Sequence, residues 1–463
     1  MRRHSGHSAG VLQREHPEAI APPGANRGRD LASPIRIRPP APRPYTARLI
    51  FTDSCMTAFV FIVFTLVYLG MALGRLPGLA LDRSGIALGG AALLLAAGAL
   101  PYGEWVHVLD LPTLVLLFAL MLIGGHFAEA GAFDAVARAL SRSPLSPLAL
   151  LGLVVATGGL LSALLVNDIV VFALTPLLVH SLAARALDPR PFLLALALAS
   201  NAGSAATLVG NPQNLLIGEL GQLDFLAYLA VAALPSTLAL VCVFAVVAWT
   251  WRGRLRLASR AEPLDEQPLQ RWLLLKSLLA VLAVAVAMLL LDRHREVAAL
   301  AIAAVLLAGR RIGTAALLKR VDWSLLVLIA SLFVVTAALA QLPIASTSVA
   351  ALDAAGLSFE RLGLLVPAAL IGSNTIGNVP LVMLLVETLG GLSQPALTAL
   401  AIFSTLAGNL LLLGSLANII TAERAAQVGV RLGFADFARV GIPVTLISTA
   451  LAMAWLLLRG WSL

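Results

Sequence analysis

GNPQN, at Gly210–Asn214, interrupts one apolar run of this chain, and GSLAN, at Gly414–Asn418, interrupts another. Polar residues that border apolar runs recur in pairs, in the same order and 204 to 212 residues apart. The pairs are Asp110 with Asp322, Asn167 with Asn378, and Asn214 with Asn418. Three matches at nearly constant spacing predict a duplicated unit of roughly 200 residues.

The composition is that of a membrane protein. The 463 residues are 59% hydrophobic and only 12% charged, and the mean hydropathy is +0.93. Apolar runs long enough to cross a hydrocarbon core of about 30 Å recur from Thr57 to Leu458. We therefore predict an all-α polytopic membrane protein embedded in the lipid bilayer. The net charge of +8 does not indicate nucleic-acid binding, because Lys and Arg occur in short loops between the apolar runs.

Four segments are expected along the chain. Residues 1–55 are rich in Arg, Pro, His and Gly and contain no apolar run, which predicts a disordered tail. Met56 stands directly before the first apolar run, so a misassigned start is the alternative interpretation of this segment. Residues 56–251 then form the first membrane repeat and residues 273–463 the second. The Arg-rich linker at 252–272 is expected in the cytoplasm.

Each repeat is expected to contain five crossings and one re-entrant hairpin, which gives about 10 transmembrane helices in total. The crossings are expected at 57–74, 85–101, 111–127, 191–218, 226–250, 273–291, 297–309, 323–340, 395–420 and 441–458. The hairpins are expected at 147–181 and 361–388. The two apolar stretches of the first hairpin are short for a full crossing, so we expect its polar tip at mid-membrane. Because five is an odd number, the second repeat is predicted to be inverted relative to the first.

Two hairpins and two broken helices carry the candidate binding residues, which mix Gly or Pro with small amides and hydroxyls. Such breaks leave backbone groups free, and lipid tolerates them only where they line a buried or wet cavity. The candidates in the first repeat are Ser162, Asn167, Asp168, Asn201, Thr207, Gly210, Asn211, Pro212 and Asn214. Those in the second repeat are Ser373, Asn374, Thr375, Asn378, Asn409, Gly414, Ser415 and Asn418. The alternative is that these small residues serve only helix packing.

The same segments suit ions of both signs. Helix N-termini attract anions, whereas freed carbonyls and side-chain oxygens coordinate cations. Neutral amide and hydroxyl oxygens suit Na⁺, for which the candidate ligands are Asn214, Ser373, Asn374 and Asn418. The two cysteines and seven histidines show no metal-ligand spacing, so we expect no resident metal or organic cofactor beyond a coupling Na⁺ or H⁺.

Asp168 is the only acidic residue expected deep in the membrane. An intramembrane carboxylate indicates a proton carrier or a cation ligand. The alternative is an N-cap for the helix that follows, since Asp caps helices well. No Lys or Arg is expected deep enough to hold an anion directly; Arg83 is expected in a cytoplasmic loop.

At these residues the chain resembles the ion transporter superfamily. That group includes divalent anion:sodium symporters, arsenite/antimonite permeases and one class of sodium/proton antiporters. Ser373-Asn374-Thr375 matches the hairpin-tip motif of the divalent-anion branch, and GNPQN resembles its Pro-Asn turn. Asn167-Asp168 with Thr175-Pro176 is similar to the arsenite permease branch. The resemblance covers about 57–458.

Two stretches depart from the dicarboxylate symporters. Ser162-Ala163-Leu164 stands where those symporters repeat Ser-Asn-Thr, and the last break lacks the Pro of the first. These departures count against a dicarboxylate substrate and a symmetric pair of Na⁺ sites.

The resemblance implies a secondary active permease of the inner membrane that moves an inorganic or small organic anion, coupled to H⁺ or Na⁺. The nearest alternative is a sodium/proton antiporter that uses Asp168. A passive channel and an intramembrane enzyme are the alternatives from other classes. We expect no enzyme, because the apolar region at 57–458 has neither a Gly-x-Ser-x-Gly nor a His-x-x-x-His pattern.

Two kinds of protein partner stay open. Members of this superfamily commonly dimerise, so the resemblance implies a homodimer as one assembly. The sequence contains no Gly-x-x-x-x-Gly-Lys-Ser/Thr run, so ATP drive would need a separate ATPase subunit.

Overall fold

The structure is a computed structural model. It describes residues 53–73, 81–253, 255, 269–291, 293–309, 311–342, 347, 351, 355–389 and 391–463. The expected tail at 1–55 and linker at 252–272 therefore fall largely outside the described residues. Asp53 already belongs to the first helix, which begins three residues before Met56.

Helices form the regular structure of the described residues, and these contain no strand. The first half contains α1 (Asp53–Leu73), α2 (Arg83–Ala96), η1 (Tyr102–Glu104), α3 (Trp105–Val108), α4 (Leu111–Glu129), α5 (Ala132–Arg142), α6 (Pro147–Leu164), α7 (Asn167–Ala183), α8 (Pro189–Ser204), α9 (Pro212–Leu220) and α10 (Phe225–Thr250). The second half contains α11 (Arg271–Leu290), α12 (Arg295–Leu307), α13 (Thr314–Leu318), α14 (Trp323–Ala340), α16 (Leu362–Thr375), α17 (Asn378–Leu389), α18 (Gln394–Ala407), η2 (Leu412–Gly414), α19 (Leu416–Gln427) and α20 (Phe434–Leu458).

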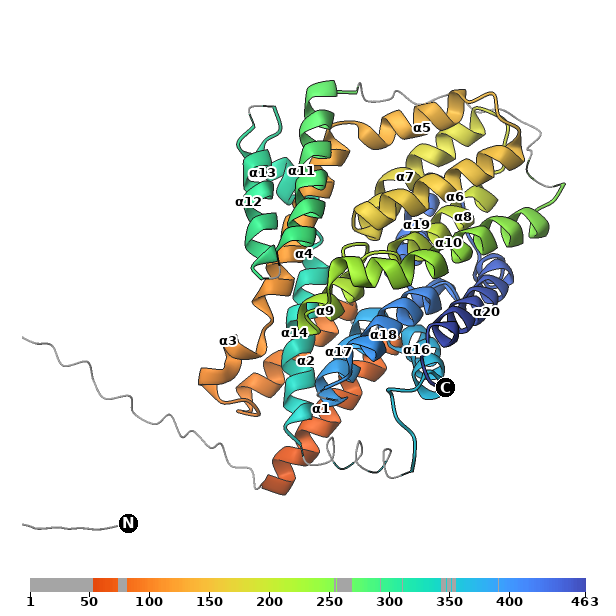
Figure 1. Cartoon of the computed structure of the whole chain (residues 1–463). Coiled ribbons are helices and arrows are strands. Elements are labelled where there is room, and N and C mark those ends of the chain that lie inside the picture. The colour runs from red at the N-terminus through yellow and green to blue at the C-terminus, as the bar shows by residue number, and fades with distance from the viewer. Residues whose placement is uncertain are drawn as a thin grey trace, which may run out of the picture. The chain divides into compact units, whose positions relative to one another are not determined.

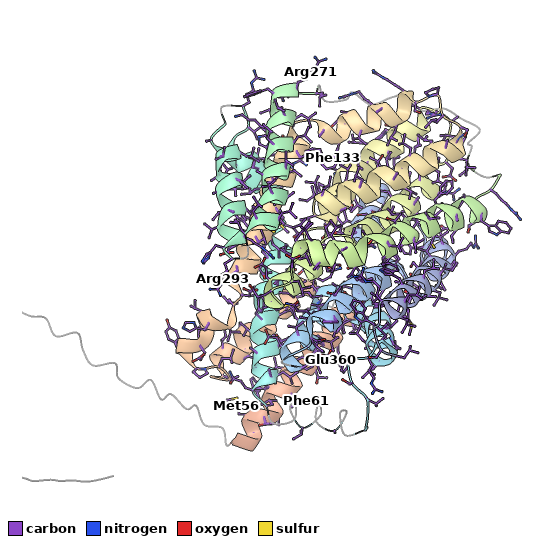
Figure 2. All side chains as sticks on the ribbon, in the orientation of Figure 1. Met56, Phe61, Phe133, Arg271, Arg293 and Glu360 are labelled. Atoms are coloured by element: carbon purple, nitrogen blue, oxygen red, sulfur yellow. The ribbon has the colours of Figure 1, made fainter. Side chains whose placement is uncertain are left out.

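Seven of the described helices are long and apolar enough to cross a membrane. They are α1, α4, α6, α10, α11, α14 and α20. Phe61, on α1, is 47% exposed, whereas Phe133, in α5, is buried at 1% (Figure 2). Apolar side chains on an outer face are expected where a helix meets lipid. The predicted all-α polytopic membrane fold is confirmed.

The same order of elements occurs in both halves. A helical hairpin (α6–α7 or α16–α17) is followed by a broken helix (α8–α9 or α18–α19) and then by a long helix (α10 or α20). This order agrees with the duplicated unit. The inversion of one half relative to the other across the membrane stays a prediction.

Some local expectations differ from the structure. The first arm of the first hairpin, α6, has 18 residues and is long enough for a full crossing, against the expectation that both arms are short. The re-entrant depth of that hairpin therefore stays a prediction. The helix α5 lies in a stretch where no element was expected. Its 11 residues alternate apolar positions with Arg and Asp, and this pattern accounts for a short amphipathic helix.

The two halves interlock. The helix α7 packs against α19, and α9 packs against α17 and α18 (Figure 1). The long helices α10 and α20 also pack together, and α14 packs against α2. The interruptions of both halves are thereby brought to one place.

Candidate functional site

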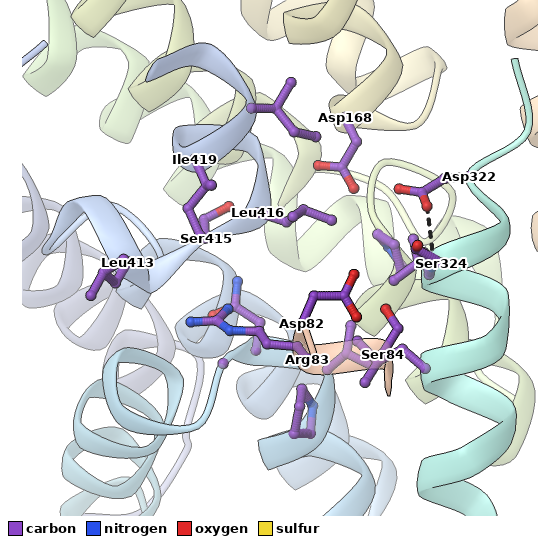
Figure 3. A pocket seen from close by; sticks show the side chains of 18 of the residues that line it. Asp82, Arg83, Ser84, Asp168, Asp322, Ser324, Leu413, Ser415, Leu416 and Ile419 are labelled. Atoms are coloured by element: carbon purple, nitrogen blue, oxygen red, sulfur yellow. Dashed lines mark hydrogen bonds between the residues drawn. The ribbon is translucent and has the colours of Figure 1, made fainter. Parts of the chain in front are cut away.

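A cavity of about 510 Å³ lies where these interruptions meet (Figure 3). Four of the helices that begin at its wall, α7, α9, α17 and α19, start at the predicted interruptions. Two more, α2 and α14, also begin there. Its polar and charged lining residues are Asp82, Arg83, Ser84, Asn167, Asp168, Gln213, Asp322, Ser324, Asn378, Ser415 and Glu423.

Local sequence explains the interruption between α8 and α9. Pro212 occupies the first turn of α9, where its missing N–H costs nothing, and Asn211 caps that helix by accepting from the Asn214 N–H at 2.9 Å. A Cβ on Gly210 would lie under 3.0 Å from the Ser204 carbonyl oxygen, so only glycine fits there. The Gly210 carbonyl accepts from the N–H of Asn167 at 2.9 Å, which ties the tip of the first hairpin to this break.

The hairpin tip between α16 and α17 relies on a different device. Gly377 has a φ of +100°, in the left-handed region that favours glycine, and α17 begins at the next residue. The Asn378 side chain then lies beside Gly408. A Cβ added to Gly408 would be 3.0 Å from the Nδ2 of Asn378. The tip of the second hairpin is thereby seated on the second break.

Asn214 and Asn418 brace the two breaks in the same way. Each Nδ2 donates to the carbonyls of the residues ten and seven positions earlier, at 3.4 and 3.2 Å for Asn214 and at 2.7 and 3.2 Å for Asn418. Each Oδ1 accepts from the opposite half, from Thr405 Oγ1 at 3.0 Å and from Asn201 Nδ2 at 3.0 Å. The spacing of 204 residues in the sequence thus corresponds to one repeated hydrogen-bond pattern.

Asn201 is the centre of the buried network. Its Nδ2 donates to Asn409 Oδ1 as well as to Asn418, and its Oδ1 accepts from Ser415 Oγ and Asn167 Nδ2. These five residues are between 0% and 6% exposed. Because they come from α7, α8, α19 and the loop between α18 and α19, the network joins both halves at the cavity.

Thr405 has the corresponding place in the second half, 204 residues after Asn201. It accepts from Asn211 Nδ2 at 3.2 Å and from Gln213 Nε2 at 3.3 Å, and it donates to Asn214. Sequence reasoning missed Thr405, although the repeat spacing applied to Asn201 points directly to it.

The structure brings most of the expected site residues together, in two layers. Those that line the cavity are Asn167, Asp168, Pro212, Asn378, Gly414 and Ser415. Those that lie behind it, in contact with the breaks, are Ser162, Asn201, Thr207, Gly210, Asn211, Asn214, Ser373, Asn374, Asn409 and Asn418. Thr375 is the exception: it is exposed, and its hydroxyl donates to carbonyls of its own helix at 2.9 and 3.1 Å.

Two of the four expected Na⁺ ligands are already engaged in the protein. The Oδ1 atoms of Asn214 and Asn418 accept hydrogen bonds, so the four cannot all serve as free ligands. Among the described residues, the Oδ1 atoms of Asn167, Asn374 and Asn378 are buried and have no partner. These three oxygens belong to the hairpin tips, and neutral amide oxygens are of the kind that suits Na⁺.

The charges around the cavity differ from the expectation in two ways. Asp168 is 9% exposed but is not the only carboxylate there, because Asp82, Asp322 and Glu423 also line the cavity. Arg83 lines it too, although no basic residue was expected within reach of an anion. Asp322 belongs to one of the repeated pairs, which is the signal that could have found it. Arg83 has no such signal in the sequence.

The capping alternative for Asp168 is not supported. The N-cap position of α7 is Val166, and no side chain caps this helix. Asp82 and Asp322 do cap, since each carboxylate accepts from a backbone N–H three residues later, at 2.8 and 2.9 Å. The carboxylate of Asp168 makes no hydrogen bond or ion pair with the part of the chain that the structure describes.

Comparisons with known proteins agree with this arrangement. The citrate transporter family (CitMHS) matches residues 59–396. A 46 kDa membrane protein of Mycobacterium leprae is 30% identical over 375 residues, covering 76% of this chain and 87% of the relative. A silicon efflux transporter of Oryza sativa subsp. japonica is 30% identical over 458 residues, covering 81% of this chain and 93% of the relative.

A solved structure shows the same fold. The YdaH transporter of Alcanivorax borkumensis superposes with a TM-score of 0.56 at 17% identity, covering 88% of this chain and 98% of that one. The family and these relatives fit the expectation that the chain is not an enzyme, and the resemblance to ion transporter superfamily permeases is confirmed. The chain belongs to the citrate transporter (CitMHS) family of membrane transporters.

Proposed function

We propose that the chain is a secondary active transporter of the inner membrane that moves a small anion through the cavity, coupled to H⁺ or Na⁺. The observation that carries this proposal is the meeting of four interrupted helices, two from each half, at one cavity. Each helix N-terminus presents roughly half a positive charge and free N–H groups, which together favour an anion. Interrupted helices at the interface of two halves are also typical of substrate sites in secondary transporters.

The coupling ion has two candidate sites. Asp168 is buried and has no partner among the described residues, and a charged carboxylate in that position is costly unless it binds a proton or a cation. The other charged groups that line the same cavity are Asp82, Arg83, Asp322 and Glu423. The orphan oxygens of Asn167, Asn374 and Asn378 support Na⁺ instead. Coupling to H⁺ would use the carboxylate, and coupling to Na⁺ would use the amides.

Flux assays in proteoliposomes test the proposal. The full-length protein is given citrate, a dicarboxylate, sulfate, phosphate and arsenite in turn, with a pH gradient, a Na⁺ gradient or neither. A secondary transporter accumulates one of these solutes above its external concentration only when a gradient is imposed, and an ionophore that collapses the gradient abolishes the accumulation. Equilibration that never exceeds the external concentration would instead identify a passive channel.

The two carboxylates Asp168 and Asp322 favour one second candidate, a sodium/proton antiporter. Both line the cavity, and Figure 3 shows them near each other at one side of it. An antiporter would release internal protons when external Na⁺ is added, with no anion present. A pH-sensitive dye inside the same liposomes separates this activity from anion transport.

A further inference from the structure

Arg83 is the basic residue of the cavity lining, and its charge is unpaired within the part of the chain that the structure describes. It begins α2, and its guanidinium makes no hydrogen bond or ion pair with the described residues. Some arginines elsewhere in the chain do have partners in the protein. Arg320 pairs with Glu129 at 2.7 Å, and Arg295 donates to two backbone carbonyls at 2.8 and 3.1 Å. A partly buried cation without a partner among the described residues is costly, and a bound anion would supply that partner.

The position of Arg83 in its helix supports the same conclusion. A positive side chain at a helix N-terminus opposes the helix dipole, which costs about 0.3–1 kcal/mol at an exposed site. Asp82 precedes it, but the Asp82 carboxylate is used to cap α2 through the Gly85 N–H. No ion pair joins Asp82 to Arg83, so neither stability nor local pairing accounts for the arginine.

The guanidinium lies at the tip of the second hairpin. Its Nη1 is 3.8 Å from the position that a Cβ on Gly377 would take. Asn378 and the N-terminus of α17 follow directly, and Ser415 at the start of α19 lines the same cavity. An anion held here would meet the guanidinium and the N-termini of two helices together.

Figure 3 shows where four charged side chains of the cavity lie. Asp168 and Asp322 lie on one side, and Arg83 lies on the other, with Asp82 beside it. An anion beside Arg83 and a proton or cation beside Asp168 would therefore occupy different parts of one cavity. The anion and the coupling ion could therefore be bound at the same time, as symport requires.

We propose that Arg83 binds the oxyanion group of the transported substrate, with two of its N–H groups donating to two oxygens of one carboxylate, sulfate or phosphate. This proposal rests on the anion transport proposed above. The fork of the guanidinium matches such groups, whereas a lysine offers a single ammonium. Arg83 would thereby restrict transport to anionic substrates.

The test compares Arg83→Gln and Arg83→Lys with a matched control, Arg320→Gln, all in the full-length protein in liposomes. The probes are citrate, sulfate and phosphate, and half-saturation and maximal rate are measured separately. For whichever probe the wild type transports, Arg83→Gln is expected to raise half-saturation by more than tenfold, and Arg83→Lys is expected to recover part of the loss. Arg320 lies outside the cavity lining, so its variant should keep half-saturation within twofold.

The outcomes separate this proposal from the transport proposal. If the wild type accumulates an oxyanion and Arg83→Gln keeps its half-saturation, the role of Arg83 is refuted while anion transport stands. If the wild type transports only an uncharged solute, the role of Arg83 is refuted while transport itself stands. Should Arg83→Gln fail to fold, Arg83→Lys decides: unchanged half-saturation in that variant refutes binding through the paired N–H groups.

Discussion

The two hairpin tips begin alike and then diverge. Asn167 and Asn378 occupy the same place, and both line the cavity with an orphan amide oxygen. The next residue is Asp168 in the first half and Val379 in the second. The duplicated unit has therefore kept the residue that builds the tip and changed the residue beside it. The first tip carries a carboxylate, whereas the second tip lies close to Arg83.

The two breaks differ in the same sense. Asn211, Pro212 and Gln213 of the first break correspond to Ser415, Leu416 and Ala417 of the second. The bracing amides Asn214 and Asn418 are unchanged and make the same hydrogen bonds. The comparison teaches that both halves share the amides that hold the backbone of the site. The carboxylate of Asp168, by contrast, has no counterpart at the matching position of the other half, which is Val379.

The largest effect is expected where the tips differ. Asp168→Asn keeps the shape and one acceptor oxygen but can no longer gain or lose a proton. If Asp168 carries the coupling proton, the variant should lose gradient-driven accumulation and the pH dependence of transport. Stability in detergent should stay near that of the wild type, because Asp168 has no hydrogen bond to lose among the described residues. Full accumulation with unchanged pH dependence would reject the coupling role.

The glycines of the two breaks should respond differently to one added methyl group. At Gly210 the nearest atoms are backbone atoms of Ser204, which cannot move away, so Gly210→Ala should abolish folding or severely reduce it. At Gly414 the nearest atom is the Oδ1 of Asn374, at the end of a side chain that could shift at the cost of its two hydrogen bonds to backbone carbonyls. Gly414→Ala should therefore fold and lose ion binding. Yield and size-exclusion profile measure the first effect and flux the second; equal folding defects would contradict the distinction.

The bracing amides should respond equally. Each of the variants Asn214→Ala and Asn418→Ala removes the amide that two backbone carbonyls accept from. Each also removes the oxygen that a side-chain donor of the opposite half bonds to. Unsatisfied buried groups cost about 1–3 kcal/mol each, so both variants should lose several degrees or more of thermal stability. The hydrogen bonds thus change our expectation for Asn214 from an ion ligand to a structural brace. A stable Asn214→Ala protein that has lost only transport would restore the ligand role.

The smallest effect is expected at Thr375. Its hydroxyl bonds to its own helix and does not line the cavity, so Thr375→Ala should change both half-saturation and thermal stability little. Ser373→Ala is the matched comparison, since Ser373 is buried and its hydroxyl donates to the Ser404 carbonyl at 3.4 Å. A loss of transport in Thr375→Ala as large as that in Ser373→Ala would show that the exposed threonine acts in the site.

The sequence by itself determined the membrane class, the helical content and the places where helices break. These features depend on composition and on residues close together in the chain, such as Pro212 in the first turn of α9 and Gly377 at the hairpin tip. The repeat spacing also found both bracing amides, because a duplicated unit keeps the residues that hold its backbone.

Only the tertiary structure decided which charges meet the cavity. Arg83 lies at a helix start that looks like an ordinary loop-proximal position in the sequence, and the packing of α2 against α14 brings it to the breaks together with Asp322. Whether an amide such as Asn214 is free or already bonded likewise depends on Thr405 and Tyr228, which are 191 and 14 residues away. The availability of a polar atom depends on its neighbours in space, and local sequence does not specify those neighbours.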